Sequence, residues 1–197
     1  MNRTDVKDFD INSFDVKTFD RILKQGLSAG LGKRGSQVCI EAAICQTLGL
    51  PHSDDPGCVA ESVRLFKISL NDSSWSNSKA RANGLRDLGL AQLGSKGIVL
   101  DTEFVTELSK KTIKVLIPKL FREIFVSNQK CLEAAMICEL EGTAASAYSA
   151  ASAARSAAYS AACSAASAKR DEYLTLSANL SLEVLKELKS PGIALLG

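Results

Sequence analysis

The residues best able to do chemistry lie in and just after one polar turn. The turn LPHSDDPGC at 50–58 holds the only histidine, His52, beside Asp54 and Asp55, and Asn71 and Asp72 end the helix predicted to follow. A histidine next to carboxylates can bind a ligand or act as a base. Asp-Pro-Gly is also an ordinary turn and helix-start sequence. We predict a turn, with a metal-dependent or ligand-binding site as the alternative.

No recognised metal or nucleophile motif accompanies this turn. A metal site needs three or four ligands at definable spacing, and the sequence has no H-x-x-H, E-x-x-H or C-x-x-C. Glu41 and Glu133 lie in the similar stretches CIEAAIC (39–45) and CLEAAMIC (131–138), which indicate either a duplication or chance convergence. We interpret both glutamates as first-turn residues favoured by the helix dipole, and we predict no metal, no cofactor and no catalytic residues.

The segment GLGKRG at 30–35 matches the spacing G-x-G-x-x-G. A dinucleotide fingerprint needs a strand before it and a βαβ unit around it, whereas an amphipathic helix is expected before Gly30. We therefore predict a loop between helices. Its free amides, with Lys33 and Arg34, could still hold an anion at the start of the next helix.

Five cations follow one another without an intervening acid at Lys110, Lys111, Lys114, Lys119 and Arg122. Apolar residues alternate with them at helical spacing, which is typical either of a solvated bundle face or of a surface for anionic lipid or nucleic acid. The net charge of the chain is only +2, which does not favour nucleic acid.

The composition is that of a globular protein, with 46% apolar and 23% charged residues. No apolar run is long enough to span a membrane, and the acidic N-terminus lacks the apolar segment of a secretory signal. The six cysteines lie mostly in apolar helical patterns. We expect reduced, buried thiols and a cytoplasmic location.

Helical periodicity and capping residues recur along the chain, and they predict an all-α, single-domain bundle of seven to nine helices. We place an acidic segment with one helix at 1–35 and the bundle at 36–197. The predicted N-caps are Asn12 or Ser13 for the first helix, Ser36 for the second and Asp101 for the fifth. Pro118 must kink or restart that fifth helix.

Residues 143–168 are almost entirely alanine and serine, with one charge, Arg155. Alanine has the highest helix propensity, so we predict a long helix within 143–189, capped by Thr143. Small side chains let helices approach closely, which indicates packing against the rest of the chain or a second copy. Tyr148, Arg155 and Tyr159 share one face and Ala154 lies on the broad alanine face; these are the predicted contact residues.

One stretch resembles a family of uncharacterised bacterial and phage-borne proteins. The resemblance covers Val38 to Leu188 and includes an Ala/Tyr-rich helical tail. The residues that carry it are Cys39, Gly49, Pro51, His52, Ser53, Asp54, Pro56, Cys58, Asn71 and Asp72. No activity is implied by the resemblance.

Taken together, the sequence predicts a non-enzymatic helical interaction module that is carried by a mobile element. Its expected partner is another protein or a second copy of the chain. The alternatives are a metal-dependent enzyme or ligand-binding module using His52, Asp54 and Asp55, and a lipid- or nucleic-acid-binding surface from Lys110 to Arg122.

Overall fold

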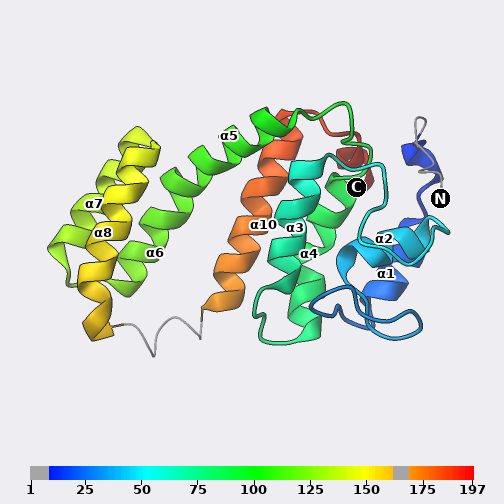
Figure 1. Cartoon of the computed structure of the whole chain (residues 1–197), viewed down its shortest axis with the longest axis horizontal. Coiled ribbons are helices and arrows are strands. Elements are labelled where there is room, and N and C mark those ends of the chain that lie inside the picture. Colours follow the sequence, from blue (N-terminus) through cyan, green and yellow to red (C-terminus); the bar gives the residue numbers. More distant parts are fainter. Residues whose placement is uncertain (1–8, 162–168) are drawn as a thin grey trace.

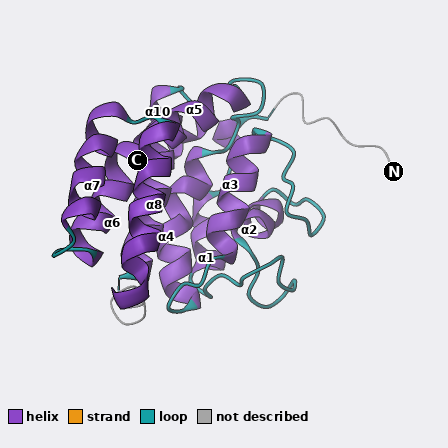
Figure 2. Cartoon of the chain, turned by 60° about the vertical axis from the view of Figure 1, so that its left-hand side comes forward, coloured by secondary structure: helices purple, strands orange, loops and turns teal. Residues whose placement is uncertain are grey.

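A computed structural model shows an all-α fold (Figures 1 and 2). It describes the backbone of residues 9–161 and 169–197, and the side chains of 9–154 and 169–197. Nine α-helices and no named strand fall within these residues, which confirms the predicted fold class. The elements are η1 Ile11–Ser13, α1 Val16–Leu23, α2 Ile40–Thr47, α3 Glu61–Asp72, α4 Ser78–Ala91, α5 Asp101–Lys111, η2 Thr112–Leu116, α6 Ile117–Ile124, α7 Gln129–Glu141, α8 Ala144–Ala161, α10 Arg170–Glu187 and η3 Pro191–Leu196.

The helices form two lobes with separate hydrophobic cores. In the larger lobe, α1, α2, α3, α10 and η3 pack around α4. α1, from the predicted N-terminal segment, belongs to this core through Phe19 and Leu23. Gly89 of α4 allows close packing, since a Cβ there would lie 2.9 Å from Ile40 Cδ1. The largest fully buried apolar side chains are Phe19, Leu27, Ile40, Ile44, Leu85, Leu88, Leu90, Leu93, Phe104 and Leu185.

The small lobe consists of α6, α7 and α8, at the opposite end of the molecule from α1 (Figure 1). α7 packs along both of its neighbours, whereas α6 and α8 touch each other sparingly. The described core cluster of this lobe has seven buried residues, of which Phe121 and Phe125 are large and the other five are alanine or cysteine. These small side chains give the lobe a small core of its own.

A nearly continuous helical path joins the lobes (Figure 1). α5 is followed by the π-helical segment η2, in which the amide of Ile117 donates to the carbonyl of Thr112. Pro118 lies at the start of α6 and has no amide to donate. The restart predicted at Pro118 is therefore confirmed.

Three of the predicted N-caps are wrong. α1 is capped by Asp15, whose carboxylate accepts from the Thr18 amide, rather than by Asn12 or Ser13. α2 begins four residues after Ser36, and the Cys39 thiol accepts from the Ala42 amide. Asp101 is the first helical residue of α5 and accepts instead from the Ser62 amide on α3.

The helical stretch predicted for 143–189 appears as two helices that lie apart, α8 in the small lobe and α10 in the larger lobe (Figure 1). Residues 162–168 lie outside the described part. Thr143 does begin α8: its hydroxyl oxygen accepts from the Ser146 amide, and its own amide donates to the Ser146 hydroxyl. This reciprocal pairing satisfies amides that a helix start leaves open.

Candidate functional site

Asn71 and Asp72 connect the end of α3 to two other segments. Asn71 Oδ1 accepts from the buried amide of Ile40, 3.2 Å away, and its Nδ2 donates to the carbonyl of Ser28. Asp72 Oδ1 accepts from the Gly30 amide at 2.7 Å. Both side chains therefore fix the glycine-rich loop onto the start of α2.

This arrangement overturns the anion site considered for GLGKRG. The chain's own Asp72 carboxylate takes the amide of Gly30, and the amide of Lys33 donates to the carbonyl of Gln37. Helix α2 starts only at Ile40, so the loop does not form its N-terminus. Gly32 in this loop has a φ of +72° and lies close to the Gln37 carbonyl, and both features favour glycine at this position.

The other residues of the predicted polar site also have partners within the chain. The ring Nε2 of His52 lies 3.3 Å from the Gly32 carbonyl. Asp54 Oδ1 lies 3.9 Å from an Arg64 guanidinium nitrogen, and Asp55 accepts from the Gly57 amide within the turn. The described residues contain no group of three His, Cys, Asp or Glu side chains placed to hold a metal ion. The contact of Asp55 lies within the predicted turn, whereas His52 and Asp54 connect the turn to the glycine-rich loop and to α3.

A small cavity lies beside this loop. Its volume is about 30 Å³, which is room for a water molecule and not for an organic substrate. Its lining comes from the glycine loop, α2 and α3, and comprises Gly30, Leu31, Cys39, Ile40, Glu41, Asp54, Ile68, Asn71 and Asp72.

A buried ion pair behind this cavity was not predicted. Lys67 Nζ lies 2.8 Å from Glu41 Oε1, with both side chains 0% exposed. Gln92 Nε2 donates to Glu41 Oε2 at 3.0 Å. Burial raises the pKa of Glu41 and lowers the pKa of Lys67, because each charge has lost its hydration.

The sequence contained a signal for this pair. Val63, Lys67, Leu70 and Asn71 are the buried residues of α3 and follow helical spacing, so Lys67 stands in a core position. Glu133, at the place in α7 that corresponds to Glu41 in α2, is exposed and accepts from Gln129. The two glutamates therefore do not form a shared carboxylate site.

Each of the five cations in the predicted basic surface contacts a group of the same chain. Lys111 pairs with Glu183 and Glu187 on α10, and Lys119 pairs with Glu172 on α10. The remaining contacts are Lys110 with Glu107, Lys114 Nζ with the Leu140 carbonyl, Lys119 with Glu123, and Arg122 with Glu139. These contacts mark the basic run as a junction between helices.

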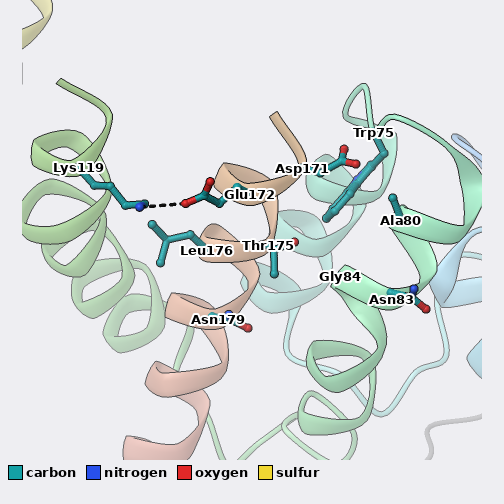
Figure 3. A pocket seen from close by; sticks show the side chains of 10 residues that line it. All are labelled: Trp75, Ala80, Asn83, Gly84, Lys119, Asp171, Glu172, Thr175, Leu176 and Asn179. Atoms are coloured by element: carbon teal, nitrogen blue, oxygen red, sulfur yellow. Dashed lines mark ion pairs between the residues drawn. The ribbon is translucent and has the colours of Figure 1, made fainter. Parts of the chain in front are cut away.

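An open groove lies along α4 and α10, and Lys119 of α6 reaches its edge (Figure 3). Its volume is about 560 Å³. The Trp75 ring forms part of one wall, and its Nε1 donates to the Leu70 carbonyl. The ion pair of Lys119 with Glu172 lies at this edge (Figure 3). The lining comprises Trp75, Ala80, Asn83, Gly84, Lys119, Asp171, Glu172, Thr175, Leu176 and Asn179.

The small lobe exposes an apolar surface, which we call the outward face: Met136, Ile137 and Leu140 of α7 and Tyr148 of α8. Leu140 is 76% exposed, Tyr148 72% and Met136 56%. The buried residues of α7 are Cys131, Ala134, Ala135 and Cys138, so the three apolar residues lie on the opposite side of that helix.

The structure separates the four predicted contact residues of the Ala/Ser helix. Tyr148 points outward, while Ala154 packs against the small-lobe core. Arg155 and Tyr159 have side chains outside the described residues. Ser146 and Ala150 are buried, and α8 lies along α7. The predicted packing of this helix against its own chain is therefore observed.

Comparison with protein-family models, curated proteins and solved structures finds no match for this chain. The resemblance to bacterial and phage-borne proteins thus stays a prediction. Within the described residues, no helix is both long and apolar enough to cross a lipid bilayer.

Proposed function

We propose that this chain is a non-enzymatic, cytoplasmic interaction module that binds another protein, or a second copy of itself, through the outward face of its small lobe. The observation that carries the proposal is that α7 and α8 both expose large apolar side chains. Exposed apolar patches mark interaction sites, and methionine and tyrosine are enriched at protein interfaces.

The surroundings of this face support the same proposal. The exposed residues of α8 between 143 and 154 are alanine, serine, threonine and Tyr148, and none carries a charge. Contact with a partner there would bury no unpaired charge, which is the costly event at an interface. The five described cysteines are buried and free, as expected in a reducing compartment.

Residues predicted for the two alternatives, the ligand site and the basic surface, are engaged in contacts within the chain. Asn71 and Asp72 stabilise a loop, and the cations from Lys110 to Arg122 contact groups of the same chain. A ligand or a lipid surface would have to displace those partners. The outward face requires no such displacement, because its side chains already face solvent.

The test compares Leu140→Glu with Leu65→Glu. Leu65 is an exposed leucine of α3 in the larger lobe, at 52% exposure, and serves as the matched control. Light scattering after size exclusion measures self-association, and co-purification from the native host measures binding to another protein. We expect Leu140→Glu to lose the complex and Leu65→Glu to keep it. Equal retention in both variants would refute the proposal.

A further inference from the structure

The two lobes are connected in a way that allows relative motion. Their cores share no buried residue, and one described connection joins them, the helix running from α5 through η2 to α6. The other connection, 162–168, lies outside the described residues. η2 lies between the two cores, because its Leu116 packs on the core of the larger lobe and its Ile113 packs on the core of the small lobe.

The connecting helix is weakened at the boundary. η2 has π-helical hydrogen bonds, which are rare and occur mostly as single turns inside α-helices, frequently at functional sites. Pro118 then removes one amide donor from the helix. A helix that loses regular hydrogen bonds over these residues bends more easily there than at α5 or α6.

Polar side chains of α6 and of the start of α10 join the two lobes. Lys119 Nζ on α6 lies 2.9 Å from Glu172 on α10. Glu123 Oε2 on α6 accepts from Lys169 Nζ at 2.6 Å and from the Tyr173 hydroxyl at 2.9 Å. We call these five residues the Glu123 cluster.

The Glu123 carboxylate at the centre of the cluster is held in its charged form. Hydrogen bonds from Lys119, Lys169 and Tyr173 lower the pKa of Glu123 to about 2. Burial and the neighbouring Glu123 raise the pKa of Tyr173 to about 12. Ion pairs as exposed as these are individually weak, and salt screens them. Such contacts can therefore hold the lobes together and still release them.

We propose that the small lobe turns about Thr112–Leu116, and that the Glu123 cluster is an ionic latch that holds α6 beside α10 in the arrangement of Figure 3. Releasing the latch moves α6 away from α10. The motion is internal to the chain, so it occurs whether or not the outward face binds a partner.

The experiment measures the distance between the lobes by single-molecule energy transfer. Dyes are attached through genetically encoded ketone residues at two exposed positions, Lys17 on α1 and Lys130 on α7. These two helices lie at opposite ends of the molecule (Figure 1). The intact wild-type chain is compared with Glu123→Gln. The matched control is Glu139→Gln, which breaks the ion pair of Glu139 with Arg122 inside the small lobe.

At low salt we expect one narrow population for the wild type and for Glu139→Gln, and a shifted or second population for Glu123→Gln. The wild type in about 1 M salt should show the same shift, because screening weakens the latch without any substitution. Circular dichroism verifies that every variant is folded. An unchanged single population in both Glu123→Gln and high salt would overturn the proposal.

Discussion

Replacing Lys67 by methionine should destabilise the protein strongly. Methionine keeps most of the side-chain volume in the core but removes the cation that is paired with Glu41. The carboxyl group then lies fully buried with one hydrogen bond left, from Gln92. Removing one partner of a buried ion pair typically costs about 3–5 kcal/mol of unfolding free energy, and we expect that loss at neutral pH.

The loss should depend on pH in a defined direction. Without Lys67, burial keeps the pKa of Glu41 above its ordinary value of 4.5. Below that value the carboxyl is protonated in both the folded and the unfolded chain. As the pH rises past it, the unfolded chain releases the proton and the folded chain retains it, so stability falls by at most about 1.4 kcal/mol per pH unit. The fall ends at the raised pKa of the folded state.

The assay is urea unfolding followed by circular dichroism, at about pH 5 and about pH 8. Adding Glu41→Leu to Lys67→Met removes the buried carboxyl group and should recover part of the lost stability. The double variant should stay about 1–3 kcal/mol less stable than the wild type, because the Gln92 amide loses its acceptor. Lys110→Met, which affects an exposed pair with Glu107, is the control and should leave stability unchanged. A loss below about 1 kcal/mol, or one independent of pH, would refute the reasoning.

Three further outcomes follow from contacts described above. Gly84→Ala should destabilise the protein by about 1–3 kcal/mol in urea unfolding and shift Trp75 fluorescence, because its Cβ would clash with the Trp75 ring. Unchanged values would contradict the packing at the groove wall. Asn71→Ala should lower the free energy of unfolding by about 1–3 kcal/mol, because it leaves the buried Ile40 amide unpaired. His52→Ala should lower it less in the same assay. The reverse order would show that the loop is held by other contacts. In the variant Cys163→Ser, the remaining thiols should react with a thiol reagent only after denaturation, because they are buried. Burial also raises their pKa, for Cys45 to about 12. Prompt reaction of the native protein would contradict that burial.

The sequence predicted the helices well where their signals are local. Periodic apolar residues located α3, α4 and α7, Gly142 ends α7 with φ of +63°, and Thr143 begins α8. The N-caps of α2 and α5 were missed because distant residues compete for them. Asn71 holds the start of α2 from α3, and Asp101 is engaged by Ser62. Such contacts depend on tertiary structure, which local spacing does not contain.

The candidate site could be predicted only in part. The exposure of Tyr148 followed from helical spacing, but the outward face also needs Met136, Ile137 and Leu140, which belong to a helix that reads as ordinary core sequence. The division into two lobes depends on which helices meet, and this separates α8 from α10. The cations from Lys110 to Arg122 appeared free in sequence because most of their acidic partners lie on α7 and α10.

Photo-crosslinking from the outward face tests the central claim most directly. A photoreactive residue placed at Leu140, and in a separate chain at Leu65, is activated in cells of the native host. We predict a covalent adduct, either a dimer of this chain or one specific second protein, from position 140 and not from position 65. No adduct from position 140, or the same adducts from both positions, would contradict the account.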